Sequence, residues 1–343
     1  MEGFHVFGIG NPLIDYLVQI DDTDLNQLQL QKGGMHLIDA PKASLLRELV
    51  KGKPLKKACG DSTANTLAAM ACLGSKTIFL GKAGNDDDGL FYENNLIAEE
   101  VHPLIPRSTI ATGSCTSFIS NDGERTLATY LGACLLLEPK DLDLDNLKAS
   151  KCLHLTGYSL EEENLKNTSL LALDTAKKNG ILVSLDLADS ALIERIKPEL
   201  KNIMVLYASV VFANEKEASS ITGSSDSKEA AQILGSMVKT AVVKVGDKGS
   251  FVCHNGEVIH IPAFEVKAID STGAGDCYNA GFLHGILHGY SVQQSAMLGS
   301  FVAAKVVSQI GARLTDEAKQ DIRKKAEDIL KDSEHSRNMP LKM

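Results

Sequence analysis

The stretch Asp270-Ser-Thr-Gly-Ala-Gly-Asp276 predicts a tight turn that leads into a helix formed by residues 277–288. Gly273, Ala274 and Gly275 carry little or no side chain, so an oxyanion can approach their backbone closely. The first N–H groups and the positive dipole end of the helix would face the same point, which suits a phosphate whose charge grows during a reaction. Asp276 lies in the first helical turn, where a carboxylate can accept a proton. A bare Gly-x-Gly followed by Asp is more often a turn with a helix cap, but the whole string is more specific.

Outward from this turn, strand-like and helix-like segments alternate, which is typical of a parallel sheet covered by helices. Apolar runs predict buried strands at residues 5–9, 77–80, 152–155, 181–186, 210–213 and 241–245. Helices are predicted at residues 163–178, 227–238, 300–312 and 315–331, and a loop followed by a helix at 59–73. The strands end in polar or glycine residues, where open α/β sheets bind their ligands.

Two segments, residues 13–39 and 114–131, break this alternation and predict antiparallel strands. We expect them to form a small β-sheet lid over the site. The rest of the chain would form one large α/β domain from residues 1–12, 40–113 and 132–332, followed by a flexible tail at 333–343.

The composition excludes several classes of protein. The chain has 343 residues, a net charge of −9 and 44% hydrophobic residues. These values are typical of a folded globular protein, and they argue against disorder and against a nucleic-acid partner bound through its phosphates. No apolar run reaches the about 18–20 residues that cross a membrane.

The cysteines point to a reducing compartment. There are seven, none in a Cys-x-x-Cys pair, which predicts reduced thiols and neither a disulfide framework nor a zinc site. The first ten residues lack the basic region of a signal peptide. We therefore expect a cytoplasmic protein.

Four motifs, in the family's order, resemble those of the ribokinase-like carbohydrate and nucleoside kinases, the PfkB family. The stretch 270–276 resembles the second signature of that family, with Ser271 where Thr is commoner. The stretch Gly60-Asp-Ser-Thr-Ala-Asn65 resembles the first signature, residues 81–89 its continuation, and Asn214-Glu-Lys-Glu217 the NxxE motif. The resemblance covers roughly residues 3–330 and implies a three-layer α/β/α fold with a mostly parallel central sheet and a small β-sheet lid. Residues 33–39 and 125–134 look most like the adenosine-kinase-like branch.

The resemblance implies roles on the phosphate side of the site. Asp276 would be the catalytic base, and Gly273, Ala274 and Gly275 the anion hole. The nucleotide-binding residues would be Asn214, Lys244, Gly246, Gly249 and Thr272. Asn214 and Glu217 would also order Mg²⁺, which keeps most of its waters and needs few carboxylates.

The resemblance also implies an acceptor side. Asp15 would grip hydroxyls of the acceptor, because a carboxylate is a good acceptor for a vicinal diol, and Asn65 would be the second contact. Further candidates are Asn11, Gly60, the lid residue Arg125 and Gly34, which lies at a lid hinge. Asp61 departs from the family's usual glycine pair, so its side chain would either narrow the pocket or accept a hydroxyl, and the identity of the acceptor stays open.

The function that follows is transfer of a phosphoryl group from ATP to a primary hydroxyl of a sugar, with Mg²⁺ and with K⁺ as a further candidate cofactor. The expected partners are a small-molecule sugar or nucleoside and ATP, in a monomer or a homodimer. The alternatives are an adenosine or nucleoside kinase and, in another class, a catalytically silent polyol- or nucleotide-binding regulator. An NAD-dependent oxidoreductase is disfavoured because Asn11 and Pro12 cannot complete Gly-x-Gly-x-x-Gly.

Overall fold

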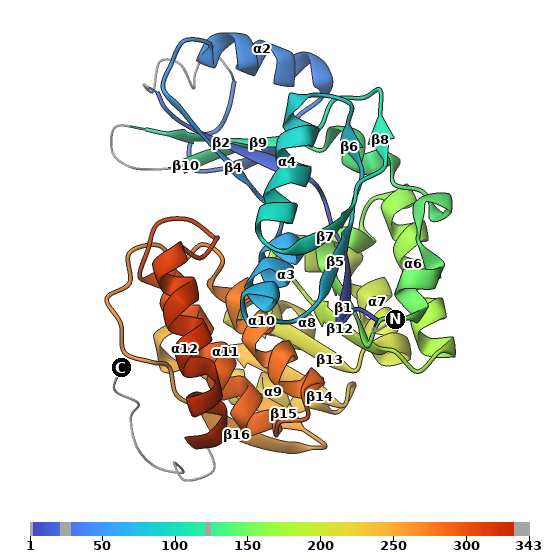
Figure 1. Cartoon of the computed structure of the whole chain (residues 1–343), viewed down its shortest axis with the longest axis vertical. Helices are drawn as coiled ribbons and strands as arrows, with labels where there is room; N and C mark the ends of the chain where they lie inside the picture. Colours follow the sequence, from blue (N-terminus) through green and yellow to red (C-terminus); the bar gives the residue numbers. More distant parts are fainter. Residues whose placement is uncertain (1–2, 21–28, 121–124, 333–343) are drawn as a thin grey trace.

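A nine-stranded sheet forms the centre of the computed structural model, which describes residues 3–20, 29–120 and 125–332 (Figure 1). The strands lie in the order β16-β15-β14-β13-β12-β11-β1-β5-β7. Their bounds are β1 (Val6–Ile9), β5 (Thr77–Leu80), β7 (Val101–Leu104), β11 (Cys152–Thr156), β12 (Leu182–Asp186), β13 (Val210–Asn214), β14 (Thr240–Lys244), β15 (Ser250–His254) and β16 (Glu257–Ile261). All pairs from β7 to β14 are parallel, and β15 is antiparallel to β14 and β16. The predicted mostly parallel sheet is confirmed.

Helices cover both faces of this sheet, because successive strand residues alternate between two apolar clusters. Val6 packs in one cluster with Leu67, and Phe7 packs in the other with Leu173. The first face carries α3 (Ser62–Cys72), α4 (Asp87–Ala98), α10 (Ala274–Leu287), α11 (Val292–Val307) and α12 (Asp316–Asp332). The second face carries α5 (Leu144–Lys148), α6 (Glu163–Lys178), α7 (Ser190–Tyr207), α8 (Glu215–Thr222) and α9 (Ser227–Gly235).

The helix predicted at residues 300–312 is wrong at both ends. Helix α11 already begins at Val292, where Ser291 and Gln294 form a capping box. It ends at Val307, and Gly311, with φ of 95°, belongs to the loop that follows. Short elements complete this body: β6 (Ala83–Gly84) paired with β8 (Arg107–Ser108), and the 3₁₀ helices η1 (Gly132–Leu136), η2 (Pro139–Asp141), η3 (Gly157–Leu160) and η4 (Gly246–Lys248).

A second sheet of five strands lies beside the large one (Figure 1). Its order is β3-β10-β9-β2-β4, formed by β2 (Leu13–Gln19), β3 (Met35–Leu37), β4 (Leu55–Cys59), β9 (Gly113–Ile119) and β10 (Arg125–Tyr130). The expectation of antiparallel strands holds for β9 with β10 and for β2 with β4. It is wrong for β2 with β9 and for β3 with β10, which are parallel.

The division of the chain at residue 39 needs correction. Residues 40–59 do not join the large sheet: β4 pairs with β2, and α2 (Ala40–Val50) packs on the small sheet through Leu46 and Val50. The physical reason is the apolar stripe of α2, which is covered by Val18 and Phe118 of the small sheet. The parts of the predicted lid at 21–28 and 121–124, and the tail at 333–343, lie outside the described residues.

The small sheet is joined to the body at one end of its strands. The chain crosses between the two at residues 10–13, 59–62, 111–113 and 130–132. Asp88, in the first turn of α4, fastens the same two strands: it accepts a hydrogen bond from the Tyr16 hydroxyl of β2 at 2.6 Å and pairs with Lys57 of β4 at 2.7 Å. Among the described residues, no helix is long and apolar enough to span a bilayer.

Candidate functional site

Asp276 lies in the first turn of α10, where α10 packs against α3. The Ser62 hydroxyl donates a hydrogen bond to Asp276 Oδ1, and Asn65 Nδ2 donates to Oδ2 at 2.8 Å. Desolvation raises the pKa of the Asp276 carboxyl, although the hydrogen bonds from Ser62 and Asn65 oppose this rise. Two hydrogen bonds therefore fix the orientation of this carboxylate, and its raised pKa makes it a stronger base than an exposed aspartate.

The turn before α10 leaves backbone N–H groups without partners in the described part of the chain. Gly273 takes φ of 79°, and an added Cβ would lie 2.7 Å from the Ala312 carbonyl oxygen, so the position requires glycine. The Ala274 N–H donates to the Ser271 carbonyl at 3.2 Å, whereas those of Gly275 and Asp276 have no partner among the described residues. These two donors therefore remain for an anion at the positive end of α10.

Lys244, at the end of β14, brings a positive charge to this turn. An added Cβ on Gly275 would lie 3.0 Å from Lys244 Nζ. The ammonium group donates to Asp186 Oδ2 at 2.9 Å and to Asn279 Oδ1 at 3.3 Å. Burial opposes ionisation of Asp186, but the Lys244 charge and hydrogen bonds outweigh it and lower the pKa of this carboxyl.

Asn214 and Glu217 form a capping box at the start of α8. The Glu217 N–H donates to Asn214 Oδ1 at 2.9 Å, and the Asn214 N–H donates to Glu217 Oε2 at 2.8 Å. Glu217 is only 4% exposed, and burial, reinforced by the Asp186 charge, raises the pKa of its carboxyl to about 7. A cation bound near such a buried carboxylate stabilises its ionised form.

These residues line one cavity of about 960 Å³, which is large enough for a nucleotide. It is bounded by the ends of β12, β13 and β14, by the turn at 273–276 and by apolar residues such as Phe264 and Val307. Gly246 and Gly249 line it as predicted; Gly249 has φ of 93°, and an added Cβ would lie 2.0 Å from the Ile261 carbonyl oxygen. Thr272 is not part of the lining, because its hydroxyl donates to Asp270 Oδ1 at 2.6 Å.

Asp15, in β2, lies against Gly60, two residues before α3 begins. An added Cβ on Gly60 would lie 2.8 Å from Asp15 Oδ2, so the missing side chain at Gly60 leaves room for that carboxylate. Burial raises the pKa of Asp15 to about 6, and the positive charge of Arg313 limits the rise. No described residue donates a hydrogen bond to the Asp15 carboxylate, which leaves both oxygens for a ligand.

Asp61 has two partners within the chain. Its Oδ1 accepts from the Ala64 N–H at 2.8 Å and caps α3, and its Oδ2 accepts from the Asn11 N–H at 2.8 Å. These two hydrogen bonds hold the side chain against the start of α3 and the backbone at Asn11. The φ of 82° explains why a glycine suits this position. The hydrogen bond to Asp61 fixes the backbone at Asn11, and the Asn11 side chain is buried.

The two lid candidates lie apart from Asp276. The Gly34 carbonyl accepts from the Leu127 N–H at 2.9 Å, and the left-handed conformation belongs to Gly33, with φ of 76°. Arg125 is exposed at the start of β10. Hydrogen bonds from Thr272 and, more weakly, the charge of Arg125 lower the pKa of Asp270, in the loop before α10.

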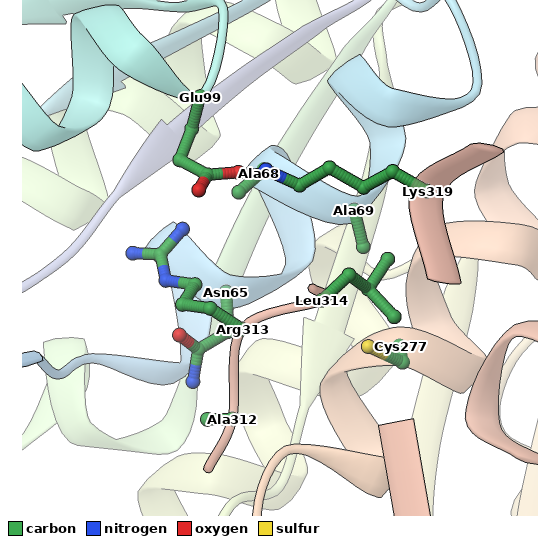
Figure 2. A pocket seen from close by; sticks show the side chains of 9 residues that line it. All are labelled: Asn65, Ala68, Ala69, Glu99, Cys277, Ala312, Arg313, Leu314 and Lys319. Atoms are coloured by element: carbon green, nitrogen blue, oxygen red, sulfur yellow. Dashed lines mark ion pairs between the residues drawn. The ribbon is translucent and has the colours of Figure 1, made fainter. Parts of the chain in front are cut away.

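Sequence reasoning missed four residues of the site: Ser62, Asp186, Asn279 and Arg313. Asp186 ends a central parallel strand, and Asn279 follows Asp276 by one helical turn, so both carried a positional signal. Figure 2 shows Arg313 beside Asn65 in a small second pocket, where Arg313 Nη1 donates to the Ala64 carbonyl at 2.9 Å. Nothing in the local pattern around Arg313 indicated this position.

Comparisons with known proteins identify the family of this chain. The family model described as pfkB family carbohydrate kinase matches residues 35–319. A 5-dehydro-2-deoxygluconokinase of Geobacillus thermodenitrificans is 27% identical over 80% of this chain and 86% of its own, and a fructokinase of Klebsiella pneumoniae is 29% identical over 72% and 83%. The crystal structure of adenosine kinase from Sinorhizobium meliloti is 32% identical, covers 94% of this chain and 99% of its own, and superposes with a TM-score of 0.84. Since the family model covers most of its length, the chain belongs to the pfkB family of carbohydrate kinases.

Proposed function

We propose that this kinase transfers the γ-phosphoryl group of ATP to a primary hydroxyl group of a sugar. The observation that carries the proposal is the position of Asp276. Its carboxylate lies at the turn that lines the nucleotide-sized cavity, and it is held by Ser62 and Asn65 of the helix that begins next to Asp15 and Gly60. The names of the relatives support a sugar as the acceptor, since two of them are kinases named for sugar substrates.

In the proposed mechanism, Asp15 and Asn65 position the acceptor, and Asp276 takes the proton of its hydroxyl as that oxygen attacks the γ-phosphorus. The N–H groups of Gly275 and Asp276 and the ammonium group of Lys244 stabilise the charge on the transferred group. Arg125 would approach the phosphates from the lid. Phosphoryl transfer is catalysed mainly by positioning and electrostatic stabilisation. Hydrogen-bond donors that are already held in place therefore stabilise the transition state better than mobile donors.

The residues present fit Mg²⁺. Five acidic residues line the cavity, against the single lysine Lys244: Asp186, Glu217, Asp247, Glu265 and Asp276. Glu217 and Asn214 would hold Mg²⁺ through water, and the bound ion would neutralise charge on the β- and γ-phosphates. In the described part of the chain, no three His, Cys, Asp or Glu side chains form a metal cluster. A role for K⁺ at the loop of Asp270 and Gly311 is a further proposal, by family resemblance.

A nucleoside acceptor is the second candidate. It is favoured by the 32% identity to the Sinorhizobium meliloti adenosine kinase over almost the whole chain. Phe118 of β9 is fully buried against α2, so this aromatic ring is not available to stack on a nucleoside base. A silent regulator would have no chemical need for the arrangement around Asp276.

We also propose that the enzyme works in the reducing cytoplasm, on small molecules and without nucleic acid. All seven cysteines lie among the described residues and are free, and Cys115 is the only one not fully buried. Free buried thiols are typical of proteins that fold in a reducing compartment. Whether it is a monomer or a homodimer is a question for light scattering.

The test is release of ADP from Mg-ATP across a panel of fructose, ribose, 5-dehydro-2-deoxygluconate, adenosine and inosine, with and without K⁺. A strong response to one sugar supports the proposal, and a response to adenosine alone replaces it by the second candidate. ATP binding without turnover across the panel would favour the silent regulator. The Asp276→Asn variant serves as the blank for contaminating kinases.

A further inference from the structure

We propose that Ser62 is an autophosphorylation site: without a sugar, its hydroxyl accepts the γ-phosphoryl group of ATP, with Asp276 as the base. The inference rests on the proposed function, because it uses the same nucleotide and the same base. It goes beyond that function because it assigns a covalent modification to a residue of the protein.

The geometry gives Ser62 the relationship to the base that a sugar hydroxyl must have. Its hydroxyl donates to Asp276 Oδ1, while Asn65 occupies Oδ2 at 2.8 Å and so leaves Oδ1 for a hydroxyl group. Ser62 is half-buried and lines the nucleotide cavity together with Gly273 and Gly275. A nucleophile, its base and the phosphate-binding turn therefore meet at one point.

Three other hydroxyl groups nearby have hydrogen-bond partners elsewhere. Thr63 is buried and donates to the Ile9 carbonyl at 3.1 Å, and Thr66 donates to the backbone carbonyl of Asp276 at 3.3 Å. The hydroxyl of Tyr278, on the cavity wall, forms a hydrogen bond with the Ser250 hydroxyl at 2.7 Å. Within the described ranges, Ser62 is the one hydroxyl that donates to the Asp276 carboxylate.

The chemical step balances without a further reactant. The proton of Ser62 passes to Asp276, a bond forms between Oγ and the γ-phosphorus, and the bond from that phosphorus to the bridging oxygen breaks, so that ADP leaves with the electron pair. The product is a phosphoserine in the first turn of α3, where the positive end of the helix stabilises the new charge. Its phosphate would fill the space beside Asp276, and the modified enzyme could not take an acceptor.

A bound sugar should protect Ser62, because its hydroxyl displaces the serine from Asp276 Oδ1. The fraction of enzyme phosphorylated on Ser62 would then increase with the ratio of ATP to sugar. Enzyme that meets ATP without its acceptor becomes inactive, which is the behaviour of an inhibitory device built into the site.

The test incubates the full chain with Mg-ATP labelled in the γ-phosphate, without a sugar, and maps the label by peptide mass spectrometry. We expect label on Ser62, lowered at least about 100-fold in Asp276→Asn and at least about tenfold by a saturating acceptor from the panel. Ser62→Ala should carry no label, and Ser236→Ala, an exposed serine of the C-cap of α9, should be labelled like the wild type.

Label on another residue only, or ATP hydrolysis without any label, would overturn the inference. Turnover of a sugar by an enzyme that never labels Ser62 would overturn it while leaving the proposed function intact. Absence of both turnover and label would overturn both proposals. The mapping on the wild-type protein and its suppression by the acceptor do not depend on how well Ser62→Ala folds.

Discussion

The ammonium group of Lys244 lies 2.9 Å from the Asp186 carboxylate, at the ends of two strands separated by β13, and neither group has a large exposed surface. Lys244→Met would leave Asp186 buried and unpaired, which typically costs about 3–5 kcal/mol of unfolding free energy. The double variant Lys244→Met with Asp186→Asn should recover most of this loss. Urea denaturation measures both, with Lys248→Met on the exposed η4 as control.

The same pair predicts a pH dependence. In the wild type the folded pKa of Asp186 lies below its ordinary value of 3.8, so the stability that this carboxylate contributes is present above pH 3.8 and is lost as the pH falls below it. In Lys244→Met the pKa of Asp186 should rise, because the carboxylate is buried without its cation. This variant should therefore regain stability when the pH is lowered and Asp186 becomes protonated. Equal unfolding free energies for Lys244→Met and the wild type at pH 8 would contradict the assigned ion pair.

Asp276→Asn tests the base. The amide keeps the shape of the carboxylate but cannot take a proton, so we expect ADP release with the best acceptor to fall about 10²–10⁴-fold. Nucleotide binding, measured by calorimetry, should change far less. A turnover within about tenfold of the wild type would exclude Asp276 as the base.

Glu217→Gln tests the metal site, because glutamine retains the capping box of α8 while removing the charge. The apparent affinity for Mg²⁺ should fall about 10–100-fold, the usual effect of losing an outer-shell partner. A Mg²⁺ titration of ATP turnover measures this, and Glu215→Gln in the same helical turn is the matched control.

In the wild type, the Mg²⁺ requirement should also rise as the pH falls through 7, where Glu217 takes up a proton. That dependence should be weaker in Glu217→Gln. An unchanged Mg²⁺ titration in this variant would remove Glu217 from the site.

Asp15→Asn should separate stability from function. The folded pKa of Asp15, about 6, lies above the ordinary value of 3.8, so the folded state binds the proton more tightly than the unfolded state does. This stability is present below pH 3.8 and lost as the pH rises through 6, at a cost of at most about 3 kcal/mol at pH 8. The variant should therefore be more stable than the wild type at pH 8 and similar at pH 4.

Whereas Asp15→Asn should raise stability at pH 8, it should lower the activity of the enzyme toward its acceptor. Losing a charged hydrogen-bond acceptor for the sugar should lower kcat/KM about 10–100-fold, mainly through KM. Asp87→Asn, on the exposed first turn of α4, is the control for both measurements. A variant that is less stable at pH 8 but binds sugar normally would show that Asp15 is a structural residue.

The parts of the fold that were predictable from sequence are those specified by neighbouring residues. The turn at Gly273 and the helix after it depend on backbone conformation and capping within a few positions. The central strands were recognisable because both of their faces are buried, which gives continuous apolar runs. The start and end of α6 agree with the predicted range, since its amphipathic pattern is local.

The parts that were missed depend on contacts distant along the chain. Lys244 meets Asp186 across 58 positions, and Asn279 meets Asp186 across 93. The pairing of β4 with β2 was missed because an amphipathic segment shows that one face is buried but not which sheet buries it. The two hydrogen bonds of Asp61 were missed for the same reason: its chain position is that of a ligand-binding glycine, but the Asn11 N–H and the α3 N-terminus engage its carboxylate.

The crossings between the small sheet and the body all adjoin the end where β2 begins and β4 finishes. Among the described residues, these connections lie at one end of the small sheet, in the manner of a cantilever. A cantilever deflects least beside its support, so bending of the sheet would move Asp15, two residues after β2 begins, less than Arg125, which begins β10 at the opposite end. The carboxylate proposed to hold the acceptor therefore has the stiff mount, and the arginine proposed to approach a phosphate has the long arm.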